Sequence, residues 1–130
     1  MISQKETVYN KLKTLKTQEI VKQVCEEGSQ TWSKMPCVTY MEINNSPGEF
    51  ADDEEYASAL AVKVDSWGNS SEEIESISIQ VTGLMEELGY QRTLFMDVPD
   101  LSSKIKHKTM RFEKREVLES NEILEMEESK

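Results

Sequence analysis

The residue types best suited to chemistry in this chain are one histidine, two cysteines and a run of acids. His107 is the only histidine among 130 residues. It has no obvious partner in the sequence, so we expect a structural or surface role for it rather than general-base catalysis. Cys25 and Cys37 lack the Cys-x-x-Cys spacing of a metal or redox site. We expect them to be free thiols packed as small apolar side chains.

The acidic run Asp52-Asp53-Glu54-Glu55 offers the carboxylate oxygens that divalent cations prefer. It lacks the alternating spacing and the central glycine of an EF-hand loop, which favours a solvated loop. A nuclease that uses these acids is an alternative only if distant residues converge on them. No glycine-rich phosphate loop and no Gly-x-Ser-x-Gly motif occurs. The sequence therefore predicts a protein that is not an enzyme, without catalytic residues, metal or cofactor.

Charge is abundant and unevenly distributed along the chain. The net charge of −10 has the wrong sign for a DNA-binding module, because such affinity comes mainly from Lys and Arg that neutralise phosphates. We therefore expect no sequence-specific binding of nucleic acid. Acids crowd the loop at 49–55 and the segment after residue 115, and a basic stretch at 104–115 lies between them. Such surfaces can pair between copies, which favours self-association, with ordinary solvated faces as the alternative.

The N-terminal residues show no basic-then-apolar signal region, and no apolar run approaches the ~20 residues of a membrane span. We expect a chain that does not associate with membranes. Its length suits one domain, with residues 1–115 forming the domain and 116–130 forming an acidic C-terminal tail. The tail is predicted either as a short amphipathic helix that docks on this chain or a neighbour, or as a frayed end.

Hydrophobic periodicity predicts two helices and four strands. The helix that follows Ser70 is the clearest, because Ser70 and Glu73 form a capping box and Gly89 is a natural stop. The first helix carries an apolar stripe and is expected to end at Gly28. In chain order we expect a helix at 3–27, strands at 35–43 and 56–67, a helix at 70–89, and strands at 91–98 and 105–114.

This order predicts an α+β fold of two layers, with an about four-stranded, mostly antiparallel sheet and two helices on one face. The first strand should be central, and the strands should pair as two hairpins. The other face of the sheet would be partly exposed, with contributions from Trp67, Lys63, Thr39 and Met41. An exposed and partly apolar sheet face is a candidate subunit interface.

Four blocks of sequence, in this order, resemble the small tail-completion or tail-terminator proteins of phages, prophages and phage-tail-like particles of Gram-positive bacteria. The resemblance covers about residues 35–115, and its signals are the order and spacing of the blocks. The C-terminal acidic tail is not explained by it. The blocks are PCVTYMEINNSPGEFADDEEYA from Pro36, KVDSWGNSSEEI from Lys63, ELGYQRT from Glu87 and KIKHKTMRFEKR from Lys104.

The resemblance implies a viral structural protein that assembles as a hexameric ring at the head-proximal end of a tail tube. Such a ring ends tube polymerisation and provides the joining surface for the neck or head. The implied partners are further copies of the chain, the tail tube protein, a neck or head-completion protein and, as an open alternative, a sheath protein. The implied location is the bacterial host cytoplasm during assembly, then the virion or a bacteriocin-like particle.

Two other functions stay open: a neck or head–tail adaptor component, and a stand-alone regulatory protein-binding domain. For a ring, charge pairing and the exposed sheet face suggest which residues meet between subunits. The expected interface residues are Asp52, Asp53, Glu54, Glu55, Trp67, Lys104, Lys106, Lys108 and Arg111.

Overall fold

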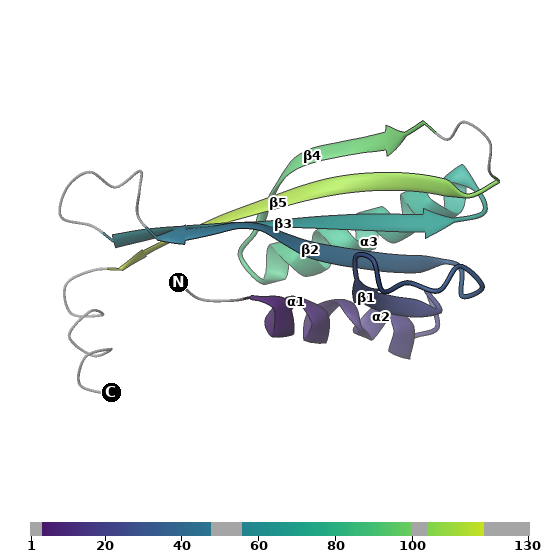
Figure 1. The fold of residues 1–130 in the computed structure, drawn as a ribbon, viewed down its shortest axis with the longest axis horizontal. Coiled ribbons are helices and arrows are strands. Elements are labelled where there is room, and N and C mark those ends of the chain that lie inside the picture. The colour runs from purple at the N-terminus through teal and green to yellow at the C-terminus, as the bar shows by residue number, and fades with distance from the viewer. Residues whose placement is uncertain (1–3, 48–55, 100–103, 119–130) are drawn as a thin grey trace.

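The computed structural model describes residues 4–47, 56–99 and 104–118. Its five strands form a single sheet in the order β1-β2-β3-β5-β4 (Figure 1). In chain order the elements are α1 (Lys5–Leu12), α2 (Thr14–Thr17), β1 (Gln23–Glu26), β2 (Cys37–Pro47), β3 (Tyr56–Gly68), α3 (Ser71–Glu87), β4 (Gln91–Val98) and β5 (Lys106–Leu118).

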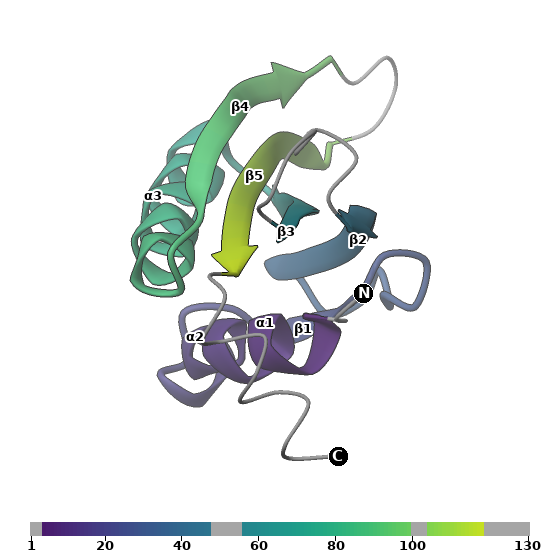
Figure 2. The ribbon, with the colours of Figure 1, turned by 90° about the vertical axis from the view of Figure 1, so that its left-hand side faces the viewer.

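The pairing of the strands confirms the expected α+β class. β2 pairs with β3, and β4 with β5, as the two predicted antiparallel hairpins. β3 and β5 form the antiparallel centre of the sheet, in register from Tyr56 opposite Leu118 to Gly68 opposite Lys106. The helices lie on one side of the sheet, as Figures 1 and 2 show. β2 is an inner strand, as predicted.

The prediction of a helix as far as Glu27 is wrong beyond Thr17. Glu19 takes a left-handed backbone angle (φ 61°), and the N–H groups of Ile20 and Val21 both donate to the carbonyl oxygen of Leu15. This arrangement ends the helix without a glycine and turns the chain into β1, a fifth strand that pairs parallel with β2. Val21 and Val24 are buried in the core all the same, and Ile20 packs against it, so helical spacing alone could not distinguish the two structures.

The start of α3 confirms the predicted capping by Ser70, whereas Glu73 reaches back one residue beyond the N-cap instead of to Ser70 itself. Ser70 Oγ accepts a hydrogen bond of 3.1 Å from the N–H of Glu73, and Glu73 Oε1 accepts one of 3.1 Å from the N–H of Asn69. At the other end, Gly89 adopts a positive φ of 93°, which a residue with a side chain adopts at a cost. The helix is thereby fixed at both ends between β3 and β4.

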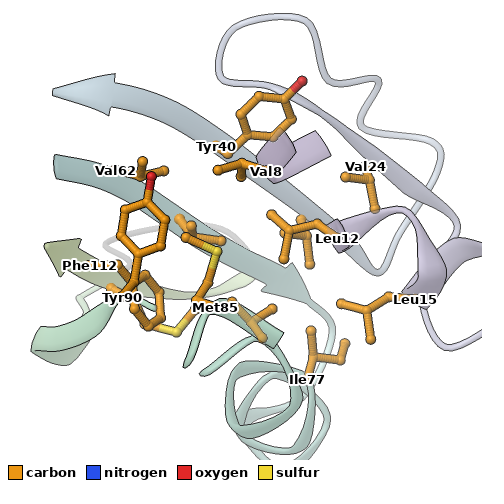
Figure 3. Packing of buried hydrophobic residues seen from close by; sticks show 14 of the residues in the cluster. Val8, Leu12, Leu15, Val24, Tyr40, Val62, Ile77, Met85, Tyr90 and Phe112 are labelled. Carbon is orange, nitrogen blue, oxygen red and sulfur yellow. The ribbon is translucent and has the colours of Figure 1, made fainter. Parts of the chain in front are cut away.

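The core lies between the sheet and the helices (Figure 3). α1 and α2 contribute Val8, Leu12 and Leu15, and α3 contributes one apolar stripe. The strands contribute every second residue, because alternate side chains of a strand point to opposite faces. From the strands and α3, the core includes Val38, Tyr40, Leu60, Val62, Val64, Met110, Phe112, Ile77, Val81 and Met85.

β5 continues through Leu118, three residues beyond the expected end of the domain at residue 115. The rest of the predicted tail lies outside the described residues. No helix in the described part of the chain is long and apolar enough to cross a membrane.

Candidate interaction face

The side of the sheet away from the helices is left uncovered by any helix of the described residues, and is called the bare face below. Strand alternation assigns its side chains, since Val62 and Val64 point into the core and their neighbours point away. The strand register arranges them in rows that cross the sheet. These rows are Met41–Lys63–Arg111–Leu94, then Thr39–Asp65–Thr109–Met96, then Cys37–Trp67–His107–Val98.

A buried carboxylate is the centre of the bare face. Asp65 is 1% exposed, although it lies on the uncovered side of the sheet. Lys63 Nζ lies 3.0 Å from Asp65 Oδ2 and 2.6 Å from Glu27 Oε1, so one lysine joins two acids. On the other side, His107 Nε2 lies 3.3 Å from Asp65 Oδ1. Burying a charge is costly unless it is paired, and these neighbours provide that pairing.

The pKa shifts follow from these contacts. Burial alone would raise the pKa of Asp65, but its interactions with the nearby His107, Thr109 and Lys63 side chains outweigh burial and hold that pKa below its usual value. Burial would lower the pKa of Lys63, but its hydrogen bonds with Glu27 and Asp65 raise it instead. Both groups are therefore charged at neutral pH, and the ion pair is a fixed feature of the bare face.

Aromatic rings cover one end of the bare face. The Trp67 ring stacks on the His107 imidazole with centroids 3.6 Å apart, and Trp67 Nε1–H donates to Thr39 Oγ1 at 3.1 Å. Trp32, from the loop between β1 and β2, meets Trp67 edge-on at 5.1 Å. Trp32 is nevertheless 51% exposed. This end of the bare face therefore presents a large, only partly covered aromatic side chain.

Half-exposed apolar side chains lie on either side of the polar centre. Met41 is 40% exposed on β2, and Leu94 and Met96 are 41% and 46% exposed on β4. Arg111, between Leu94 and Lys63 in its row, holds Glu113 with Nε 3.0 Å from Oε2. Exposed apolar groups that lie together on one surface are a feature of protein interaction sites.

The expected interface residues are placed as follows. Asp52, Asp53, Glu54 and Glu55 lie outside the described residues. Trp67 is half-buried on the bare face and Arg111 shares that face, whereas Lys104 and Lys106 are exposed. Lys108 is buried on the opposite face of β5 from Arg111. It pairs with Glu75 of α3, and its Nζ lies 3.4 Å from Asp97 Oδ1. The basic residues of 104–111 are therefore divided between two faces.

Sequence reasoning missed the polar centre of the bare face. Asp65 stands in a strand of apolar and small residues, and such an acid indicates a buried partner. The partner could not be named, because His107 and Glu27 reach Asp65 only through the register of three strands and the β1–β2 loop.

The expectation that Cys25 and Cys37 are free thiols is confirmed. Burial, and to a smaller extent the nearby Cys25, raises the pKa of the Cys37 thiol to about 12.

Within the part of the chain that the structure describes, no group of three or more His, Cys, Asp or Glu side chains could hold a metal ion. The contact between Asp65 and His107 resembles the orienting half of a catalytic triad, but both contacting atoms are buried and Trp67 covers the imidazole. The arrangement holds the Asp65 charge in place below the partly exposed side chains of the bare face.

In sequence, this chain has little in common with known proteins. No model of a known protein family matches it, and no curated protein sequence matches it. Among solved structures, a similar one is described as bacteriophage SPP1 gp17 protein, with a TM-score of 0.49 and 17% sequence identity. The match covers 83% of this chain and 86% of that one. At this level of similarity the function has to be inferred from the residues of the chain itself.

Proposed function

We propose that this chain is a structural subunit of a phage tail or phage-tail-like particle, which forms a six-membered ring at the head-proximal end of the tail tube. The ring ends tube polymerisation and presents a joining surface to the neck or head. Its partners are neighbouring copies, the tube protein and a neck or head-completion protein. The proposal is supported by the four sequence blocks that resemble tail-terminator proteins and by the bare face of the sheet.

The bare face is the observation that carries the proposal. A regular sheet holds Met41, Leu94 and Met96 in fixed positions, so little side-chain or loop ordering is needed on binding. The central charge is already paired, since Lys63 lies between Asp65 and Glu27. A partner can therefore cover this face without leaving a buried charge unpaired, which would be strongly destabilising.

The test replaces two apolar side chains of the bare face. Leu94→Glu with Met96→Glu adds two like charges to the surface that would be covered, without touching the core. With such a subunit, electron microscopy of particles should show tubes of irregular length that lack the end ring. Ile79→Glu is the matched control, because Ile79 is 58% exposed on α3, on the helix side. It should leave tubes of normal length.

Localisation of the wild-type protein tests the proposal independently. Labelled subunits should be found at one end of each tail, next to the head where a head is attached. Label along the whole tube, or particles without label, would contradict the terminator function. A stable monomeric mass in the presence of tube protein would instead favour a stand-alone regulatory domain.

The charge pairing expected between subunits has its own test. Asp52→Lys with Asp53→Lys, and Lys104→Glu with Lys106→Glu, should each weaken ring formation. Combining the two charge reversals should restore it in part, because opposite charges would again face one another. If the combined variant assembles no better than either single reversal, these residues do not pair across the interface. A neck or adaptor component would be recognised by its position beyond the tube end.

A further inference from the structure

The first two helices carry a basic surface on an otherwise acidic protein. Lys5, Tyr9, Lys13 and Lys16 follow one another at helical spacing on one exposed flank of α1 and α2, and are called the basic stripe below. Tyr9 is 37% exposed, and Lys13 Nζ lies 5.7 Å from its ring centroid. Residues 4–22 hold five lysines and two glutamates, in a chain with a net charge of −10.

The helices use the neighbouring side to hold the fold, and the side chains of the basic stripe are exposed beside it. Val8, Leu12 and Leu15 are almost fully buried against the sheet. Lys11, next to the stripe, is taken by Glu87 of α3 at 2.7 Å. The stripe itself combines lysines with the half-exposed ring of Tyr9. A surface of this kind suits an acidic segment that also carries apolar side chains.

One segment of this chain has that chemistry. Residues 119–130 include five glutamates and one lysine, and Ile123, Leu124 and Met126 lie among the glutamates. The segment follows directly on β5. Its charge is opposite to that of the basic stripe, and its apolar residues could cover the exposed ring of Tyr9.

The segment is long enough to reach the stripe of its own chain. The N–H of Gln4 donates to Glu42 Oε1 at 2.6 Å, and the register places Glu42 opposite Val62 and Val62 opposite Phe112. The start of α1 therefore lies level with the row of Phe112 but on β2, two strands or about 10 Å across the sheet from β5. Leu118 is six residues further along β5, or about 20 Å. The following twelve residues span up to about 40 Å when extended, which covers the return and part of the stripe.

The direction of the elements fits this path. In Figure 1 the end of β5 and the start of α1 both lie toward the left of the sheet. A segment that leaves β5 there meets the first turn of α1 before the rest of the stripe. We propose that the C-terminal segment, residues 119–130, binds the basic stripe of its own chain. This proposal does not depend on ring formation or on the bare face.

The consequence is electrostatic. A row of exposed lysines would attract polyanions such as DNA, because phosphate contacts dominate that kind of binding. An acidic segment held on the stripe competes for those lysines. The chain would then present less positive charge on the side of its first two helices.

The test uses the full chain with a spin label on Ser129→Cys. The label should attach selectively at neutral pH, because burial raises the pKa of both Cys25 and Cys37 and keeps them as thiols. In amide NMR spectra, the signals of Tyr9, Lys13 and Lys16 should lose most of their intensity relative to the reduced label. They should recover it in 1 M salt, where the screening length falls to about 3 Å. Undiminished signals on α1 and α2, or loss on β4 instead, would overturn the proposal.

Two controls distinguish specific binding within one chain from general charge attraction and from binding between two chains. Lys13→Glu with Lys16→Glu should restore the signals of Tyr9, whereas Lys104→Glu with Lys106→Glu, a matched pair of exposed lysines on β5 and just before it, should not. A mixture of isotope-labelled wild type with unlabelled, spin-labelled protein should show no loss. Loss in that mixture would mean that the segment binds a second copy, and would overturn binding within one chain.

Discussion

The two faces of the sheet are built from the same strands and held by different physics. On the helix-covered face, the strands present Val62, Val64 and Phe112 to an apolar core. On the bare face, the intervening residues include Lys63 and Asp65, joined to Glu27 and His107. The first face gains free energy from each apolar group removed from water. The second loses stability when one of its charges is left unpaired.

The comparison shows that burial and stabilisation are separate properties. Asp65 is as buried as most of the core, at 1% exposed. Yet a buried ion pair contributes little net free energy, because desolvation offsets the attraction between its members. Removing one member is costly all the same, since the other is then left unpaired. The covered face should therefore respond to lost volume, and the bare face to lost partners.

The largest expected effect is on the covered face. Phe112→Ala removes a fully buried ring next to Tyr90 and Met85 (Figure 3). The free energy of unfolding should fall by about 3–5 kcal/mol, from lost apolar transfer and from the cavity left behind. Urea denaturation followed by circular dichroism measures this loss. A loss under about 1 kcal/mol would mean that the helices do not depend on this core.

Asp65→Asn is the matching change on the bare face. It preserves shape and removes the charge that holds Lys63 and His107, and should cost about 1.5–3 kcal/mol. Glu113→Gln, an exposed acid on the same face, is the matched control and should change stability by less than about 0.5 kcal/mol. Equal losses in the two variants would contradict the special status of the buried pair.

The pH dependence of the same variant sharpens this result. The pKa of Asp65 in the fold lies below its usual value, so its carboxylate stabilises the protein above its unfolded pKa, near 3.9. That contribution is lost as the pH falls through the lower pKa of the folded state. The wild type should therefore lose more stability than Asp65→Asn between about pH 5 and pH 3, and the gap between them should narrow. Unfolding curves at both pH values measure the gap, and a constant gap would contradict the pairing.

The two faces also differ in how far the sequence could predict them. The covered face was predictable, because Leu60, Val62 and Val64 alternate along one strand and Ser70 with Glu73 marks the start of α3. The bare face required knowledge of which strands are neighbours. His107 meets Asp65 through the β3–β5 register, and Glu27 reaches Lys63 from a turn after β1. β1 has only four residues, too few for alternation to show, so its apolar residues fit a helical spacing equally well.

The aromatic end of the bare face should show an intermediate effect. Trp32→Ala removes the edge-on partner of Trp67, and such pairs are worth about 0.5–1.5 kcal/mol beyond area burial. The free energy of unfolding should fall by about 1 kcal/mol, and the fluorescence of Trp67 should shift as its ring gains water contact. Trp32→Phe should recover most of the stability. An unchanged Trp67 emission in Trp32→Ala would show that the loop does not cover this end of the face.

The smallest effect on stability separates the fold from binding. Leu94→Gln with Met96→Gln changes side chains that are 41% and 46% exposed on the edge strand β4, so the free energy of unfolding should move by less than about 0.5 kcal/mol. Ring formation should nevertheless be lost, because these apolar groups would be buried only in the assembly. Light scattering over a concentration series, with urea denaturation of the same samples, measures both quantities. A large loss of stability in the dilute monomer would mean that Leu94 and Met96 stabilise the fold itself. Rings that still form with this variant would contradict the bare face as an interface.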